Sequence, residues 1–323
     1  MLQFSPFAPR LPSISFFWCF RISCLTFVGF FVGLQGQAWA QQNERALFVS
    51  VTDASGSPVL NLPPSEFLVE EDGAQREVLR VEATRKRMQV ALLVDTSAAA
   101  AFALADIRTG LETLVATLHQ DNEIALVTFG GPPRILVEST SRLNRLQDGI
   151  GRVFAFSDSA SYLLDALVQT ARGFERRESP RPVVIVLTSE GTDYSRSSAR
   201  DALEALEATS AATHVVVLLS RSNVAGGFAD FDGNVGANDP YQRNLALAQL
   251  PEATGGQRRD LLLSSALGRT LRQLTTTLMN QYELVYSRPT SLIPPEEISV
   301  RMRRDDLRAR ATPVKLTITG NPQ

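Results

Sequence analysis

The chain contains few of the residues on which most enzymatic and metal chemistry depends. Among its 323 residues are two cysteines, Cys19 and Cys24, and two histidines, His119 and His214. It has no Gly-rich phosphate loop, no Gly-x-Ser-x-Gly nucleophile motif and no His-Glu-x-x-His zinc motif. We therefore expect that the protein is not an enzyme and that both histidines are structural.

An excess of either charge is also missing. Lys and Arg number 32 against 34 Asp and Glu, and no basic run stands out, so nothing favours nucleic acid as a partner. The apolar fraction of 44% is ordinary for a globular protein. The length suggests two domains, or one domain with an appendage.

The first 40 residues differ from the rest. They hold no acidic residue, an apolar stretch over residues 25–34, and small residues at Ala38 and Ala40, the two positions that a signal peptidase reads. We predict a signal peptide over residues 1–40 and a secreted or periplasmic protein. An uncleaved membrane anchor is the alternative, because signal peptides usually span roughly 15–30 residues. Both cysteines lie in this segment, so the mature chain would have no disulfide and no thiolate ligand.

The central part of the chain, residues 86–281, alternates between two patterns. Continuous apolar runs at residues 90–94, 182–187 and 214–219 are typical of strands buried on both faces, and segments with helical spacing separate them. This alternation predicts an α/β domain with a doubly wound, mainly parallel sheet.

The flanking parts, residues 41–85 and 282–323, contain short alternating strands and turn residues such as Asp72-Gly73. Neither part has enough apolar surface to be stable alone, so we expect both to join in one small β module. The α/β domain would then be inserted between them. The last strand of the module is expected at residues 314–319.

Residues 220–243 are rich in Gly, Asn and Asp, which predicts a long surface loop. Residues 230–234 look faintly like a calcium loop. The ligand spacing is incomplete and no closing Glu follows, so we interpret them as a solvated loop.

Oxygen-bearing side chains follow the predicted buried strands. Asp95 and Ser97 come after residues 90–94, Ser161 precedes a helix, and Glu190 follows the strand at 182–187, with Asp193 nearby. Open α/β sheets bind ligands at this carboxyl edge, and oxygen ligands suit hard cations such as Mg²⁺, Mn²⁺ or Ca²⁺. The alternative for Asp95 is that it caps the following helix.

These segments resemble the von Willebrand factor type A domain of bacterial secreted proteins, in which a short β module flanks the domain. The resemblance lies in VDTSA at Asp95, SASYLLDAL at Ser161, LTSEGTD at Glu190, and the β-module segments VTDASGSPV, SEFLVEEDG and QYELVYS. It implies a Rossmann-like fold. It also implies a metal ion-dependent adhesion site, in which Asp95, Ser97, Ser161 and Glu190 hold a divalent cation that binds a carboxylate of a protein partner.

Three positions depart from the family pattern. Ala99 stands where the family has a second Ser, Ser161 replaces Thr, and Glu190 replaces Asp. Because Mg²⁺ demands near-octahedral geometry, we expect a weakened cation site, or a domain that keeps the fold without the metal. The sequence thus predicts an exported protein-binding module of the adhesion or assembly type. A metal-independent structural or scaffold protein of the cell envelope is the alternative.

Overall fold

The computed structural model describes residues 43–156, 159–219, 240–288, 295 and 297–313 of the chain. The predicted signal peptide, the calcium-like segment at 230–234 and the strand expected at 314–319 lie outside these residues. Within the described part, every helix is too short or too polar to cross a membrane.

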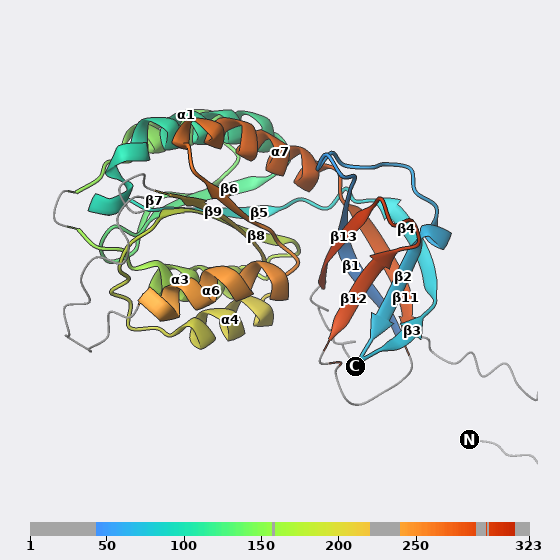
Figure 1. Cartoon of the computed structure of the whole chain (residues 1–323). Coiled ribbons are helices and arrows are strands. Elements are labelled where there is room, and N and C mark those ends of the chain that lie inside the picture. Colours follow the sequence, from blue (N-terminus) through green and yellow to red (C-terminus); the bar gives the residue numbers. More distant parts are fainter. Residues whose placement is uncertain (1–42, 157–158, 220–239, 289–294, 296, 314–323) are drawn as a thin grey trace, which may run out of the picture. The chain divides into compact units, whose positions relative to one another are not determined.

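A six-stranded sheet forms the centre of the α/β domain, in the order β10-β9-β8-β5-β6-β7 (Figure 1). Its first five strands are parallel, and β7 pairs with β6 in the antiparallel direction. The strands are β5 (Gln89–Val94), β6 (Glu123–Thr128), β7 (Arg134–Thr140), β8 (Pro182–Ser189), β9 (Ala212–Leu218) and β10 (Arg258–Leu261). Every residue of β8 and β9 is buried, which confirms the sheet predicted from the apolar runs.

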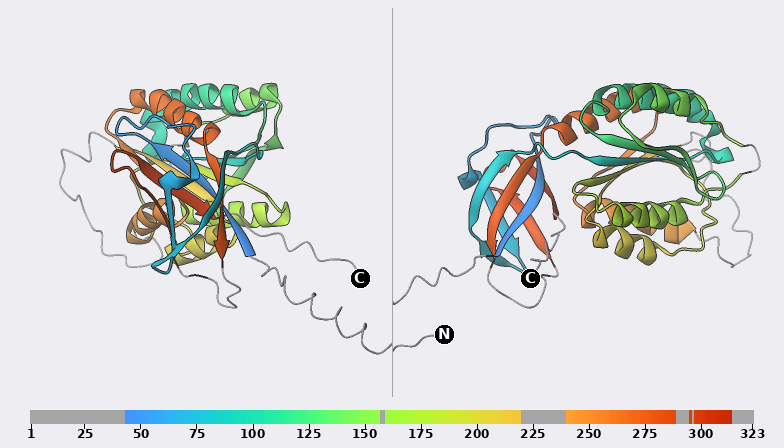
Figure 2. Two further views of the ribbon diagram at one scale, coloured as in Figure 1. Left: turned by 90° about the vertical axis from the view of Figure 1, so that its right-hand side faces the viewer. Right: turned by 180° about the vertical axis from the view of Figure 1, so that it is seen from behind.

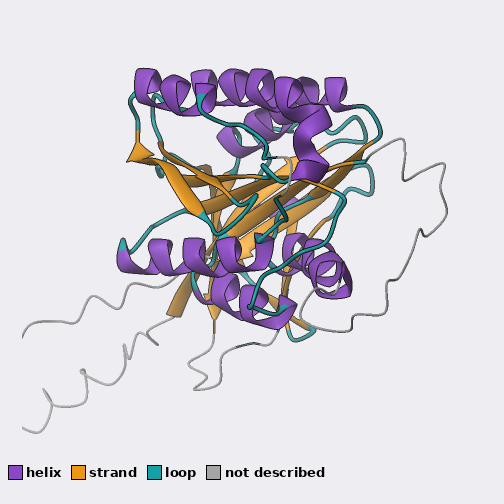
Figure 3. Cartoon of the chain, turned by 90° about the vertical axis from the view of Figure 1, so that its left-hand side faces the viewer, coloured by secondary structure: helices purple, strands orange, loops and turns teal. Residues whose placement is uncertain are grey.

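Helices cover both faces of this sheet (Figure 3). Val90, Leu92 and Val94 of β5 pack against the first layer, and Ala91 and Leu93 against the second. The first layer consists of α1 (Leu104–Leu118), α2 (Leu143–Gly151) and α7 (Leu267–Met279). The second consists of α3 (Leu163–Arg176), α4 (Ala199–Ala208) and α6 (Pro240–Ala253). The carboxyl ends of the strands therefore open between two helix layers, where the predicted site residues lie.

The β module contains strands from both parts of the chain, as predicted, and the blue and red strands of Figure 2 lie side by side. One antiparallel sheet has the order β13-β1-β11-β4 and the other the order β12-β2-β3. The N-terminal strands are β1 (Asn43–Thr52), β2 (Phe67–Glu71), β3 (Ala74–Arg76) and β4 (Val78–Ala83). The C-terminal strands are β11 (Tyr282–Arg288), β12 (Ile298–Met302) and β13 (Arg308–Pro313). Phe67, Leu47 and Leu284 are among the residues of its core.

The turn at Asp72-Gly73 joins β2 to β3, and both residues have positive φ, 48° and 76°. This is the type I′ geometry that a two-residue hairpin loop favours. The residues that follow this turn are divided between β3 and β4, which belong to different sheets.

One helix of the α/β domain begins with a 3₁₀ segment, and another begins earlier than the sequence pattern indicates. The helix that follows β5 starts as a 3₁₀ helix, η2 (Ala98–Ala103), before α1. The loop expected to extend to residue 243 ends earlier, because α6 begins at Pro240. Proline suits a first helical position, since its fixed φ is helical and it needs no N–H partner there. Residues 240–243 are therefore helical, and this correction bears directly on the site.

A buried charge cluster at the carboxyl edge of the sheet

Asp95 directly follows β5 and is 1% exposed. Its Oδ1 accepts a hydrogen bond of 2.9 Å from the Ser97 backbone N–H. Its Oδ2 accepts from the Thr188 hydroxyl at 2.9 Å, and from the Ser189 N–H and hydroxyl at 3.2 and 3.3 Å. The carboxylate therefore joins the end of β5 to the end of β8. These partners lie outside η2, so capping of the following helix is not its main contact.

Ser161 lies on the loop before α3 and is paired with Asp193, not with Glu190. Its hydroxyl donates to Asp193 Oδ2 at 3.0 Å, and both side chains are buried. Asp193 also accepts from the Leu163 N–H at 2.7 Å and from the Ser195 N–H at 2.9 Å. Sequence analysis noted Asp193 beside Glu190 but did not assign it a role.

Ser97 is 2% exposed, and Glu190, at the end of β8, is half-buried. Asp95, Ser97 and Glu190 therefore lie at the same carboxyl edge, as predicted. Ala99 contributes no oxygen there, and its Cβ lies against the loop at Gly191.

Arg243 is the residue of this cluster that sequence analysis missed. It extends from α6 and is 2% exposed. Its Nη2 donates to the Thr188 hydroxyl at 2.8 Å and to the Ser189 carbonyl. Burial lowers the pKa of Arg243, whereas the negative charges of Asp95, Asp193 and Glu190 raise it. Since a guanidinium stays protonated in proteins, Arg243 is a buried positive charge that three carboxylates stabilise and the charge of Arg258 opposes.

A signal for Arg243 was present in the sequence. The buried face of α6 consists of Ala246, Leu247 and Leu250, and Arg243 precedes them at the i, i+3, i+4, i+7 spacing of an apolar stripe. An arginine in such a stripe points into the protein. The Gly, Asn and Asp content of the preceding residues favoured a loop instead.

The donor set does not fit a divalent cation in this arrangement. Such an ion needs several oxygen atoms whose lone pairs converge on one point. Here both oxygens of Asp95 accept hydrogen bonds, the Ser161 hydroxyl donates to Asp193, and Arg243 adds a positive charge. The described residues include no group of three or more His, Cys, Asp or Glu side chains placed to hold a metal ion. The four ligands drawn from the resemblance stay a prediction.

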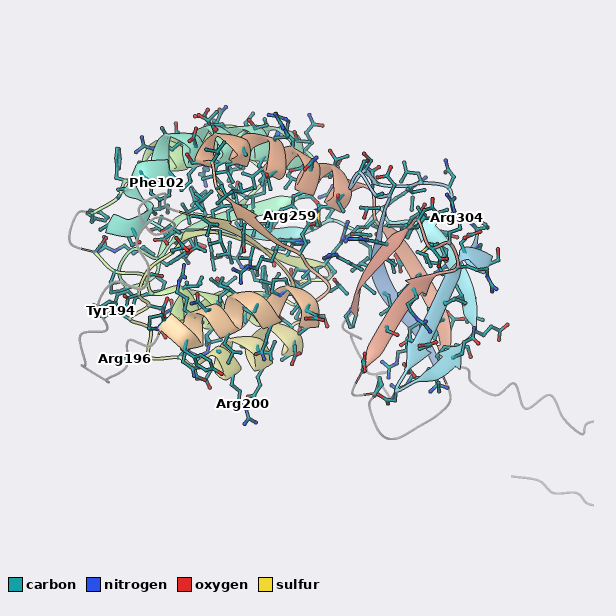
Figure 4. The ribbon with its side chains drawn as sticks, viewed as in Figure 1. Phe102, Tyr194, Arg196, Arg200, Arg259 and Arg304 are labelled. Carbon is teal, nitrogen blue, oxygen red and sulfur yellow. The ribbon has the colours of Figure 1, made fainter. Side chains whose placement is uncertain are left out.

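Exposed aromatic side chains surround this cluster. Every exposed Phe or Tyr of the described residues lies on a loop or helix start at the carboxyl edge, namely Phe102, Phe154, Phe156, Tyr194 and Tyr241. Figure 4 shows Phe102 and Tyr194 at the same end of the α/β domain. Their loops rest on the site itself, because the Phe156 N–H donates to the Thr96 carbonyl at 3.2 Å and the Tyr194 N–H to the Ser161 carbonyl at 2.7 Å.

Comparison with known families gives a match over residues 90–192, to the family described as von Willebrand factor type A domain. Comparison with curated proteins gives no match.

Similar solved structures include three distant ones. A von Willebrand factor type A protein from Catenulispora acidiphila is 11% identical with a TM-score of 0.46, over 85% of this chain and 67% of that one. BatB from Bacteroides thetaiotaomicron is 16% identical with a TM-score of 0.43, over 59% and 98%. Proximal thread matrix protein 1 of the mussel byssus, described with a zinc-occupied MIDAS motif, is 15% identical with a TM-score of 0.45, over 65% and 49%.

Proposed function

We propose that the α/β domain, whose residues 90–192 match the von Willebrand factor type A domain, is a protein-binding module whose partner docks on the loops at the carboxyl edge of the sheet. Domains of this type typically bind proteins. The proposal is that this one serves adhesion or assembly and catalyses no reaction.

The placement of the exposed aromatic side chains carries this proposal. Phe156 is 60% exposed, Phe102 50% and Tyr194 43%. Aromatic residues are enriched at protein interfaces, because they bury a large area at a small cost in conformational entropy. A group of exposed apolar side chains on one face of a soluble domain marks an interaction site. The described part of the chain exposes its Phe and Tyr side chains at this edge alone.

We further propose that the protein acts outside the cytoplasm, in the periplasm or beyond the cell. Support comes from the leader-like composition of residues 1–40. N-terminal sequencing of the exported protein would identify the cleavage site, and an intact N-terminus would favour the membrane anchor.

The test of partner docking uses a photo-crosslinking amino acid in place of Tyr194, in the organism of origin, followed by purification of the crosslinked protein. The affinity of that partner is then measured for the wild type and for Phe102→Ser/Phe156→Ser. The matched control is Leu60→Ser/Leu79→Ser, which removes two exposed apolar side chains from the β module.

We expect the edge variant to lose at least about tenfold in affinity, since buried aromatic anchors dominate interface energies. The β-module control is expected to bind as the wild type does. If the β-module variant lost affinity and the edge variant bound as the wild type does, the proposal would be contradicted. That result would favour a scaffold protein that contacts its partner through the β module.

A further inference from the structure

We propose that the guanidinium of Arg243 is the resident cation of this domain and takes over the role that a divalent metal ion has in a metal ion-dependent adhesion site. The carboxyl edge would then be held in one state by a side chain of the protein and would not respond to divalent cations.

The position of Arg243 calls for an electrostatic explanation. It begins the buried stripe of α6, whose other members, Ala246, Leu247 and Leu250, are at most 1% exposed. Removing a guanidinium from water is costly unless opposite charges and hydrogen-bond acceptors compensate for the lost hydration. The acceptors are the Thr188 hydroxyl and the Ser189 carbonyl, and the opposite charges are those of Asp95, Asp193 and Glu190. Asp95 and Glu190 belong to the metal site that the resemblance implies.

The hydrogen bonds that link Arg243 to Asp95 through Thr188 and Ser189 have a fixed direction. A guanidinium only donates and a carboxylate only accepts, whereas a hydroxyl can do both. Arg243 donates to Thr188 Oγ1 at 2.8 Å, and Thr188 donates its single proton to Asp95 Oδ2 at 2.9 Å. Arg243 also donates to the Ser189 carbonyl, and the Ser189 N–H donates to the same Asp95 oxygen. Two parallel paths at the end of β8 thus connect the cation to the carboxylate.

The three acidic residues at this edge all act on the same group. Asp95, Asp193 and Glu190 each favour the charged form of Arg243. They come from the loops after β5 and β8, so the single charge of the arginine offsets part of the negative charge at this edge, while Arg258 acts on Arg243 in the opposite direction. Unlike a bound ion, Arg243 cannot dissociate, and unlike a lysine it cannot readily lose its proton. A divalent ion entering the cluster would meet a fixed positive charge as well as the missing oxygen at Ala99.

The buried position also bears on how a partner is recognised, a step that rests on the proposed function. A metal ion with an open coordination position can bind a carboxylate from a partner. Arg243 is 2% exposed, so its guanidinium lies out of reach of an acidic side chain of a partner. The exposed aromatic side chains would then provide recognition.

The test measures the thermal unfolding of the purified full chain in EDTA, in Mg²⁺ and in Mn²⁺, together with Mn²⁺ binding by electron paramagnetic resonance. The variants are Arg243→Met, which removes the charge but keeps an unbranched chain, and Arg243→Lys, which keeps a charge. Arg196→Met is the matched control, because Arg196 is an exposed arginine on a loop at the same edge (Figure 4).

For the wild type, Arg243→Lys and Arg196→Met, we expect that the Tm of each protein does not change between EDTA, Mg²⁺ and Mn²⁺. Arg243→Met is expected to have a lower Tm in EDTA, to recover part of the loss in Mn²⁺, and to bind Mn²⁺ at least about tenfold more tightly than the wild type, because a like charge has been removed beside three carboxylates. If Arg243→Met does not fold, the double variant Asp95→Asn/Arg243→Met is used, which removes one charge of each sign. We expect this double variant to recover folding.

The wild-type measurement can overturn the inference by itself. A Tm that falls in EDTA and rises with Mg²⁺ or Mn²⁺ would show that the native cluster holds a metal ion. Failure of Arg243→Met to gain Mn²⁺ binding, or failure of the double variant to fold better than Arg243→Met does, would also contradict it. Neither readout needs a partner, so a failure of the docking proposal leaves this test unaffected.

Discussion

Ser161 donates its hydroxyl to the Asp193 carboxylate at 3.0 Å, and this bond joins the loop before α3 to the loop after β8. Asp193 also accepts from the N–H of Leu163, the first residue of α3, whose own N-cap residue Tyr162 makes no side-chain cap. A carboxylate from a distant loop therefore satisfies the start of the helix, where negative charge is favourable. The two loops form one unit.

Asp193→Ala is expected to lower the free energy of unfolding more than Ser161→Ala does. The aspartate variant leaves the buried N–H groups of Leu163 and Ser195 without their acceptor, a loss of about 3 kcal/mol, whereas the serine variant removes one donor, at about 1 kcal/mol. Urea unfolding of both single variants and the double variant measures the difference. Because Ser161 and Asp193 are in contact, the double variant should lose less than the sum of the single losses. Strict additivity would contradict the pairing.

Gly130→Ala is expected to disturb the Asp95 loop. A Cβ at Gly130 would lie 2.1 Å from the Thr96 backbone carbon and 2.3 Å from the Ser97 nitrogen, so the chain must move. We expect a loss of about 3 kcal/mol, at the upper end for an overpacked site. The matched control is Gly173→Ala in α3, where nothing lies within 4 Å of the new Cβ and the helix should gain about 0.5–1 kcal/mol. Equal unfolding midpoints for the two variants would refute the close approach.

The fold could be predicted because it depends on local patterns. The apolar runs in β5, β8 and β9 and the type I′ turn at Asp72-Gly73 are visible without knowledge of the partners. Strands from the two flanking parts were expected to meet because each lacked apolar surface of its own. The division between β3 and β4 could not be predicted, because Glu77 alone separates the two strands. Which sheet each strand joins depends on partners elsewhere in the chain, and the local sequence does not reveal these.

The site was harder to predict than the fold. Periodicity assigns a side chain to a face but does not name its partner, so the edge position of Asp95 was evident and its bonds to Thr188 and Ser189 were not. Arg243 was missed because the composition of the preceding loop outweighed the helical spacing that begins at this residue. A basic residue within an apolar stripe is the kind of local inconsistency that marks a functional or strained site.

The β module has a buried carboxylate whose contribution can be measured. Glu71 is 1% exposed and accepts from the Tyr286 hydroxyl at 2.6 Å and from Arg76 Nε at 3.0 Å, with Arg288 Nε at 3.4 Å. Burial, followed by the bond to Glu71, raises the pKa of Tyr286, so the phenol stays a donor.

Tyr286→Phe is expected to lower the free energy of unfolding by about 2 kcal/mol, because the lost bond has a charged acceptor. Tyr282→Phe, on the same strand, is the control. Its hydroxyl makes two bonds to neutral groups, donating to the Val59 carbonyl at 2.8 Å and accepting from the Leu62 N–H at 3.2 Å, so the loss should stay below that of Tyr286→Phe. Chemical denaturation of both variants compares them, and a larger loss for Tyr282→Phe would argue against an ionised Glu71.

His214 on β9 should make the stability of the protein depend on pH. The side chain is 4% exposed, and neither ring nitrogen has a hydrogen-bond partner among the described residues. Burial, with a smaller contribution from Arg310, lowers the pKa of His214 to about 3. The folded protein therefore keeps this ring neutral below pH 6.5, where the unfolded chain takes up a proton.

The unfolded state binds the additional proton. The contribution of His214 to the free energy of unfolding is therefore fully present above about pH 6.5, and it is lost as the pH drops toward 3, by up to ~1.4 kcal/mol per pH unit. Replacing the ring in His214→Leu should remove this component, whereas His119→Gln, at the end of α1, should keep it. Denaturation curves at several pH values between 3 and 7 give the slope for each variant. The buried carboxylates contribute equally to all three slopes, so the difference between wild type and His214→Leu isolates the histidine. Parallel slopes for these two proteins would mean that His214 is protonated in the folded state, which its unpartnered, buried ring does not favour.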